Sequence, residues 1–166
     1  EAEGVDGEEV ARRILERVLS PSEFLSDYGI RSLSKYHELH PFVFGHSEVR
    51  YDPAESDNKI KGGNSNWRGP IWFPTTFLII ESLRKLGQGY GAELAVAPAG
   101  DPGGLWDVSQ MAARIADRMI GIFTRNKEGR RPVYGGTDKF QKDPYWRDFI
   151  LFYEFYHGDN GAGLGA

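Results

Sequence analysis

Residues 62–74 read GGNSNWRGPIWFP, and an apolar run, TTFLIIESLRKLG, follows at residues 75–87. The first segment places two tryptophans, an arginine and two asparagines between paired glycines and a proline. Flat aromatic faces bind the apolar C–H faces of sugar rings, and amide and guanidinium groups bind sugar hydroxyls. The alternative is a glycine-rich loop whose tryptophans plug the end of a core. The density of polar and aromatic groups favours a site for a polyhydroxylated ligand.

The composition is that of a soluble globular domain, with 166 residues, 40% hydrophobic and 27% charged. The net charge is −4 and the basic residues are scattered, which disfavours nucleic acid as the main partner. Since the chain has no cysteine, it has neither a disulfide frame nor a thiolate metal site. We find no apolar stretch of membrane-spanning length and no signal peptide in the acidic first twenty residues. The compartment stays open, with a cytoplasmic location favoured.

The two ends of the chain resemble cuts in a longer protein. The sequence opens at EAEGVDGEEV without a methionine and closes at GAGLGA, a glycine-rich stretch that caps no element. We therefore expect residues 1–166 to be a fragment of a single domain, truncated at both ends.

Apolar periodicity predicts three main helices, over residues 7–19, 71–86 and 107–123. Asp6 and Asp107 are the expected N-caps, and Gly87 is the expected stop of the second helix. The second helix is apolar on most sides, which predicts that it is buried. Short strand pieces are expected near residues 30–33 and 42–44, a helical turn at residues 143–144, and a β-like segment at residues 150–156.

The order of these elements is helix, long loop, helix, long loop, helix, long loop, with hardly any alternating strand. A parallel α/β sheet would need repeated strands between the helices. The pattern therefore favours an all-α toroid, in which helices form the wall and long loops carry the site. Three helices alone cannot close such a toroid.

The second informative segment covers residues 148–166, DFILFYEFYHGDNGAGLGA. Glu154 is the only charged residue between Phe149 and Tyr156. An apolar setting would raise the pKa of this carboxyl, which suits a general base working near neutral pH. The alternative is that Glu154 is simply an exposed residue on an edge strand. Composition alone favours neither the general base nor the exposed strand residue. The glycines that follow would let the backbone approach a ligand closely.

The segments NSNWRGPIWFP and LFYEFYHGDNGAGLGA resemble the C-terminal catalytic domain of glycoside hydrolase family 63. Two further stretches, FLSDYGIRSLSKYHELHPFVF and YDPAESDNKIKGGNSNWRGP, are similar to the same domain, so the resemblance covers roughly residues 20–166. That family includes the processing α-glucosidase that trims mannosyl-oligosaccharides. The resemblance implies a partial (α/α)6 barrel (a six-hairpin toroid), an oligosaccharide or small glycoside as substrate, and no cofactor.

In that family two carboxyl groups invert the anomeric centre, and they stand about 6.5–9.5 Å apart to leave room for water. The resemblance assigns the general base to Glu154 and leaves the general acid before residue 1. It places the sugar pocket on the Trp-Arg-Gly-Pro motif, at Trp67, Arg68, Gly69 and Pro70. Four further side chains are expected to line this pocket: Asn64, Trp72, Tyr156 and His157. Arg68 could bind sugar hydroxyls or hold Glu154 by its charge.

Several alternatives remain beside an inverting α-glucosidase. One is a mannosyl- or glucosyl-glycerate-type hydrolase on the same barrel, and another is a non-catalytic carbohydrate-binding protein on a decayed barrel. A metal site at His37 and His40 is disfavoured because their spacing does not put two ligands on one helix face. The acidic loop at residues 52–58 lacks the pattern of a calcium-binding EF-hand. We expect residues 1–166 alone to be inactive.

Overall fold

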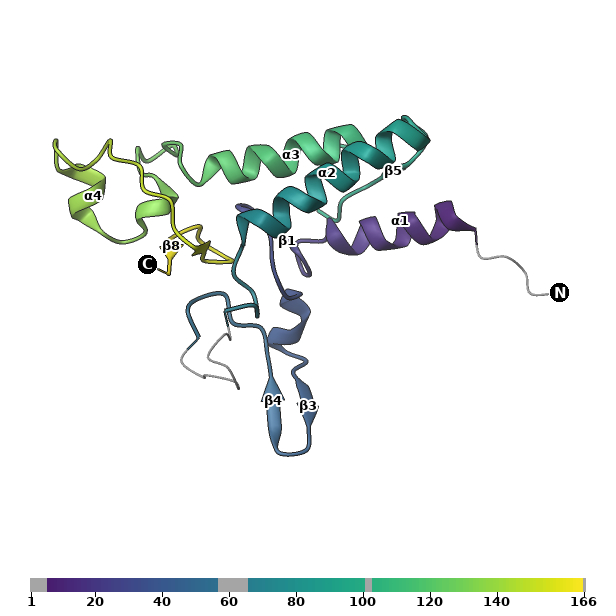
Figure 1. Cartoon of the computed structure of the whole chain (residues 1–166), viewed down its shortest axis with the longest axis horizontal. Helices are drawn as coiled ribbons and strands as arrows, with labels where there is room; N and C mark the ends of the chain where they lie inside the picture. Colours follow the sequence, from purple (N-terminus) through teal and green to yellow (C-terminus); the bar gives the residue numbers. More distant parts are fainter. Residues whose placement is uncertain (1–5, 57–65, 101–102, 166) are drawn as a thin grey trace.

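A computed structural model of the chain describes residues 6–56, 66–100 and 103–165. Its helices are α1 (Gly7–Val18), α2 (Phe73–Tyr90), α3 (Val108–Gly121) and the short α4 (Asp138–Lys142). Two 3-10 turns, η1 (Lys35–Glu38) and η2 (Pro132–Tyr134), lie in the loops. Helices α2 and α3 pack against each other, and α1 lies beside them (Figure 1). Among the described residues, no helix has the length and apolarity needed to cross a bilayer.

Eight short strands form four separate two-stranded antiparallel sheets in the described residues. The pairs are β1 (Leu25–Ser26) with β2 (Gly29–Ile30), β3 (Phe42–Phe44) with β4 (Ser47–Val49), β5 (Ala95–Val96) with β6 (Trp106–Asp107), and β7 (Phe155–Tyr156) with β8 (Gly163–Leu164). The chain is therefore mixed α and β, and the prediction of an all-α partial (α/α)6 barrel is wrong. Strands of two or three residues are too short to produce the alternation by which a sequence shows a strand.

The predicted caps of α1 and α3 are confirmed. The Asp6 side chain accepts the Glu8 backbone N–H at the start of α1. Asp107 and Gln110 form a reciprocal capping box at the start of α3, which satisfies two backbone N–H groups of the first turn. Both helices begin where a local side chain meets the free N–H groups of a helix start.

Helix α2 differs from its prediction in two ways. It continues through Gly87 to Tyr90. Gly87 lies where α2 meets α3, and a Cβ there would stand 3.3 Å from the Val108 side chain, so the glycine allows close packing and does not end the helix. The helix is also not buried all round, since Phe77 and Leu78 are 57% and 63% exposed. Its buried side is the one that faces α3.

Two clusters of buried side chains make up the core. The larger lies between α1, α2 and α3 and includes Leu15, Ile80 and Ile115. The smaller joins Ile71 and Tyr156 to residues 122–134 and lies at the start of α2. This second cluster places the two motif segments of the sequence next to each other.

Candidate functional site

The tryptophan-rich motif and the segment after Glu154 are joined by backbone pairing at one residue. The Ile71 N–H donates to the Tyr156 carbonyl oxygen at 2.8 Å, and the Tyr156 N–H donates back to the Ile71 oxygen at 2.9 Å. On its other edge Ile71 forms an antiparallel bridge with Arg31. Segments at residues 31, 71 and 156 therefore lie side by side, and the two motifs belong to one site.

An aromatic stack runs from the first motif onto the hairpin formed by β7 and β8. The Trp67 and Trp72 rings are parallel, with centroids 3.9 Å apart and planes inclined by 6°. Trp72 in turn stacks on Phe155, with centroids 5.0 Å apart. Trp72 is buried, whereas Trp67 is 39% exposed and lines an open groove of about 280 Å³ that Thr75 also borders. Trp67 is thus the accessible ring of the stack.

Arg68 and Gly69 are held tightly by the loop at residues 51–56. The buried Arg68 guanidinium donates to the Ser56 hydroxyl and lies 3.6 Å from the Asp52 carboxylate. The Asp52 N–H donates to the Arg68 oxygen at 2.6 Å. A Cβ on Gly69 would lie 2.7 Å from the Asp52 oxygen, so a larger residue does not fit there.

Glu154 is exposed immediately before β7. Its N–H donates to the Gly165 carbonyl oxygen at 3.4 Å, and its side chain lies against the Gly165 backbone. Of the two alternatives that the sequence left open for Glu154, the structure shows the exposed one, and Phe152, two residues earlier, is itself 76% exposed. A carboxylate at this place is accessible to water and to a ligand, and its role as general base stays a prediction.

The glycine-rich run after Glu154 contacts the protein's own tyrosines. A Cβ on Gly161 would stand 2.6 Å from the Tyr28 ring, and a Cβ on Gly163 would overlap the Tyr153 ring. At these two positions the close approach that the sequence assigned to a ligand is made by Tyr28 and Tyr153.

His157 lies in the turn of the β7–β8 hairpin and is half-buried. Its Nδ1 accepts the Asp159 backbone N–H at 3.1 Å, which places the ring proton of the neutral form on Nε2. Burial lowers the pKa of His157 and outweighs the opposing effect of the Asp159 and Asp52 carboxylates. The ring is therefore a neutral Nε2–H donor near pH 7.

The remaining predicted pocket residues have different surroundings. Tyr156 is fully buried, and its hydroxyl accepts the Tyr153 N–H at 3.1 Å. The Trp72 Nε1–H donates to the Asn66 carbonyl oxygen at 2.9 Å. Tyr156 and Trp72 therefore support the site from the core side. Asn64 lies outside the described residues, and its predicted role stays a prediction.

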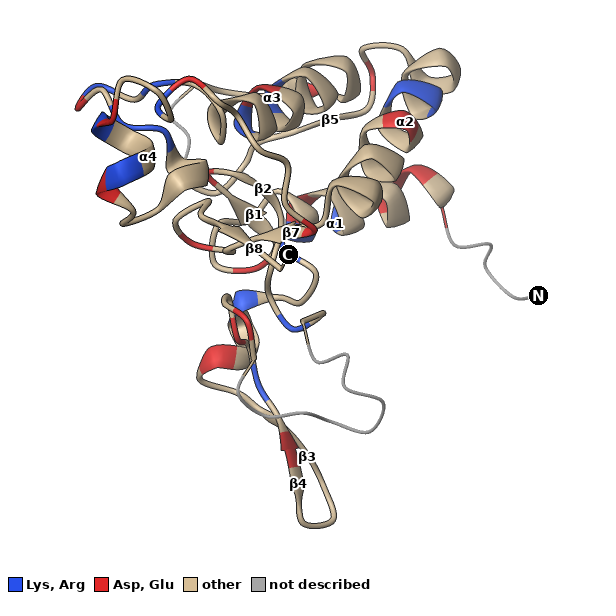
Figure 2. Ribbon diagram, turned by 60° about the vertical axis from the view of Figure 1, so that its left-hand side comes forward, with Lys and Arg blue, Asp and Glu red and all other residues tan. Residues whose placement is uncertain are grey.

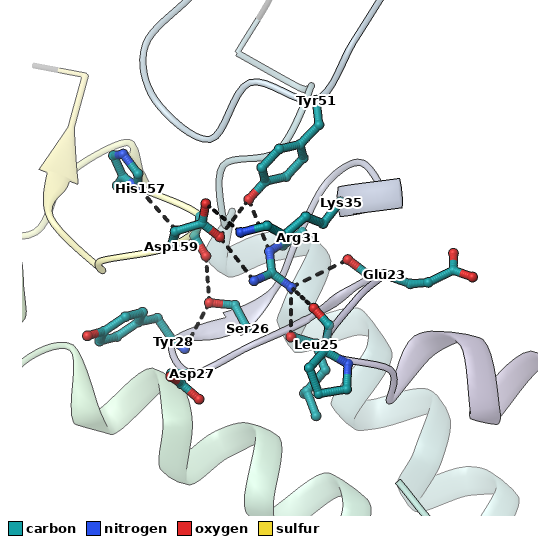
Figure 3. A network of polar contacts seen from close by, with 12 residues as sticks. Glu23, Leu25, Ser26, Asp27, Tyr28, Arg31, Lys35, Tyr51, His157 and Asp159 are labelled. Carbon is teal, nitrogen blue, oxygen red and sulfur yellow. Dashed lines mark hydrogen bonds and ion pairs between the residues drawn. The ribbon is translucent and has the colours of Figure 1, made fainter. Parts of the chain in front are cut away.

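The sequence did not predict a polar network that surrounds Asp159 in the β7–β8 hairpin (Figure 3). The Asp159 carboxylate accepts hydrogen bonds from Arg31 Nη2 at 3.0 Å, the Tyr51 hydroxyl at 2.9 Å and Lys35 Nζ at 3.1 Å. Arg31 Nε also donates to the Tyr51 hydroxyl at 3.0 Å. Tyr51 and Arg31 lie 108 and 128 residues from Asp159 along the chain. No local pattern could have revealed the network.

Burial and hydrogen bonds together set the protonation states of Asp159 and Tyr51. Burial alone would raise the pKa of Asp159, but the bonds from Tyr51, Lys35 and Arg31 hold it below its usual range. Burial raises the pKa of the Tyr51 hydroxyl, which Arg31 only partly offsets. Near pH 7 Asp159 is therefore ionised, and Tyr51 keeps the proton that it donates.

The family model of the mannosylglycerate hydrolase MGH1-like glycoside hydrolase domain matches residues 2–166. The chain belongs to this family. It is also 48% identical over 159 residues to the uncharacterized protein YMR196W of Saccharomyces cerevisiae, an alignment that covers 92% of this chain. The same alignment covers 15% of the yeast protein, so the chain spans a small part of that relative.

Membership in the MGH1-like family confirms the resemblance seen in the sequence at the level of glycoside hydrolases. Within the described residues of this MGH1-like domain, Lys and Arg are interspersed with Asp and Glu (Figure 2). No cluster of one charge therefore marks the site among the described residues. The site is marked by the exposed side chains of Trp67 and Glu154 and by His157 on the β7–β8 hairpin.

Proposed function

We propose that this chain supplies the general base and part of the sugar-binding wall of a glycoside hydrolase, which cleaves a glycosidic bond with inversion at the anomeric carbon. The observation that carries the proposal is the backbone pairing of Ile71 with Tyr156. It sets the tryptophan stack directly beside the hairpin that begins at Glu154. The family match supports the reaction class.

Glu154 is the base in this proposal. Inversion requires a carboxylate that takes a proton from water on the face opposite the leaving group. The exposed position of Glu154 leaves room for that water. The partner carboxyl, which would protonate the leaving oxygen from about 6.5–9.5 Å away, is expected outside residues 1–166.

Trp67 and His157 are the proposed contacts to sugar. The exposed Trp67 ring offers an apolar surface for the C–H face of a pyranose, and Trp72 beneath it holds the ring flat. The half-buried His157 offers Nε2–H to a hydroxyl. Arg68, bonded to Ser56 and close to Asp52, fixes the loop beside the stack.

Two substrate classes fit this site. The resemblance of the two motifs to glycoside hydrolase family 63 favours an α-glucosidic bond. The printed description of the matched family, mannosylglycerate hydrolase MGH1-like, favours a mannosyl- or glucosyl-glycerate, whose aglycone carries a carboxylate. A panel of neutral α-glucosides and glycosyl-glycerates, assayed with the complete protein, separates the two classes.

The decisive variant is Glu154→Gln in the complete protein, with Glu128→Gln as the matched control. Glu128 is also exposed but lies in the turn before η2. Loss of a general base lowers kcat by about 10²–10⁴-fold, so we expect that loss at Glu154 and a value within twofold of wild type at Glu128. Proton NMR of the first product reports inversion. Near-normal turnover by Glu154→Gln would refute the assignment, and sugar binding without turnover by the wild type would favour a binding protein.

A further inference from the structure

The structure assigns a second role next to the proposed base: we propose that Asp159 is a positioning residue. Together with Arg31 and Tyr51 it locks the β7–β8 hairpin, and through the hairpin it fixes Glu154 and the His157 ring. The kinetic part of this inference rests on the proposed function, whereas the locking of the hairpin does not.

The contacts of Asp159 form a closed triangle. Arg31 donates to both the Tyr51 hydroxyl and the Asp159 carboxylate, and the Tyr51 hydroxyl donates to the same carboxylate oxygen. Lys35 binds the second carboxylate oxygen. Because Arg31, Tyr51 and Asp159 are each hydrogen-bonded to the other two, the Asp159 carboxylate has little freedom to move. Such charge-assisted bonds are shorter and stronger than neutral ones.

Arg31 is itself anchored before it reaches Asp159. Its Nη1 donates to the Leu25 carbonyl oxygen at 2.7 Å and to the Pro21 oxygen at 3.2 Å, and the side chain is 7% exposed. Figure 3 shows the guanidinium between these carbonyls and Asp159. The hairpin is therefore attached to the backbone of residues 21–25 and not to a mobile surface side chain.

The stretch at residues 25–32, which contains β1 and β2, anchors both motifs. The Ser26 hydroxyl donates to the Gly158 carbonyl oxygen at 2.6 Å, on the hairpin side. The Ser32 hydroxyl accepts the Gly69 N–H at 3.1 Å, on the tryptophan side. With Arg31 between them, these serines fix the hairpin relative to Trp67 and Trp72. The β1–β2 segment is the common base of the site.

Asp159 reaches the proposed reacting groups through its own backbone. Its N–H sets the His157 tautomer, and the turn closes through a bond from the His157 N–H to the Ala162 oxygen at 2.8 Å. The hairpin then continues to the bond between the Glu154 N–H and the Gly165 oxygen. Since a misplacement of about 1 Å can cost about 100-fold in rate, loosening this turn should lower turnover more than it weakens binding.

Asp159→Asn in the complete protein tests the role, with Asp138→Asn as the matched control. Asp138 also binds two cationic side chains, Lys142 and Arg130, but on the surface of α4. We expect Asp159→Asn to lower kcat for glycoside hydrolysis by about 10–100-fold. KM should rise by a much smaller factor, because Trp67 on the other motif still binds the sugar when the His157 contact loosens. Asp138→Asn should leave both constants unchanged. Rates are compared at a temperature at which circular dichroism shows every variant folded, so a general loss of stability does not produce this split.

Tyr51→Phe removes one corner of the triangle and gives a second test. It should lower kcat less than Asp159→Asn does, and adding it to Asp159→Asn should lower kcat little further, because both act through one lock. Additive losses in the double variant, or a loss confined to KM, would overturn the positioning role.

Hydrogen–deuterium exchange of the peptide covering residues 155–165 measures the lock without any substrate. We expect exchange at least about tenfold faster in Asp159→Asn than in the wild type, and unchanged exchange in Asp138→Asn. Unchanged exchange in Asp159→Asn would overturn the inference, as would faster exchange with a normal kcat. If the wild type hydrolyses no glycoside, the proposed function fails, and the exchange rates still decide whether Asp159 locks the hairpin.

Discussion

Replacing Gly161 by alanine should destabilise the chain through two separable effects. Gly161 lies in the turn between β7 and β8, has φ +72°, and its missing Cβ would stand 2.6 Å from the Tyr28 ring. Tyr28 lies in the turn between β1 and β2, so this contact joins the two hairpins of the site. The substitution therefore tests how closely they pack.

The magnitude follows from the two effects. A left-handed backbone costs a residue with a Cβ about 1–2 kcal/mol. Carbon atoms prefer separations of about 3.5–4.0 Å, so the Tyr28 ring must move by about 1 Å, and overpacking of this kind costs about 1–3 kcal/mol. We expect a loss of about 3 kcal/mol in the free energy of unfolding and a Tm lower by about 6–12 °C.

Two other glycines separate these effects in the same assay, urea and thermal unfolding followed by circular dichroism. Gly129 has φ +73° with no atom within 4 Å of its missing Cβ, so Gly129→Ala should show the backbone cost alone, about 1 kcal/mol. Gly136 has neither a left-handed φ nor a close neighbour, so Gly136→Ala should be near neutral. Adding Tyr28→Ala to Gly161→Ala should remove the overlap.

The refuting result is specific. If Gly161→Ala costs no more than Gly129→Ala, the Tyr28 ring does not restrict the turn, and the two hairpins do not pack closely at this contact. If Gly161→Ala lowers the free energy of unfolding by the same amount with and without Tyr28→Ala, overlap with the Tyr28 ring is not the cause of the loss.

Three further results are expected. Trp67→Ala should raise KM about tenfold and cost about 1 kcal/mol in urea unfolding through the lost stack, whereas the buried Trp72→Ala should cost about 3–5 kcal/mol; equal effects on stability would contradict the roles given to the two rings. Asp159, whose pKa lies below its usual range, stabilises the fold at neutral pH, and this contribution is lost as the pH falls through the lowered pKa. The stability difference between wild type and Asp159→Asn should therefore stay constant from about pH 7 to about pH 5 and narrow as the pH falls further, and a difference that stays constant in acid would contradict it. Phe44→Ser, on the exposed tip of the β3–β4 hairpin, should change the unfolding free energy by less than about 0.5 kcal/mol.

Features fixed by neighbouring residues could be predicted from the sequence. The N-caps Asp6 and Asp107 act on N–H groups two or three residues away, so the residue types alone reveal them. The strand at Phe42–Phe44 was also predicted with its observed bounds. The family resemblance predicted that the tryptophan motif and the Glu154 segment belong to one site. Backbone pairing of Ile71 with Tyr156 places the two segments side by side.

Features that depend on distant contacts could not be predicted. Gly87 serves as a close contact to Val108 of another helix, which its position in the sequence does not reveal. The exposure of Glu154 is likewise set by the fold and not by its apolar neighbours in the sequence. The predicted all-α fold class was wrong because the short strands also depend on distant contacts. Each sheet pairs only two or three residues per strand, so pairing is decided by tertiary position and not by a repeating pattern.

The long separation between Arg31 and Asp159 has a consequence for how the chain acquires its structure. Their hydrogen bond joins residues 128 positions apart, and closing a loop of that length costs about 4 kcal/mol of chain entropy. At about 5–20 residues per second, a ribosome adds Asp159 about 6–25 seconds after Arg31. During that interval the guanidinium has only its contacts to the carbonyls of residues 21–25 and to the Tyr51 hydroxyl, because the hairpin that carries Asp159 is still being synthesised. The hairpin can therefore join the rest of the site only after residue 159 has been added.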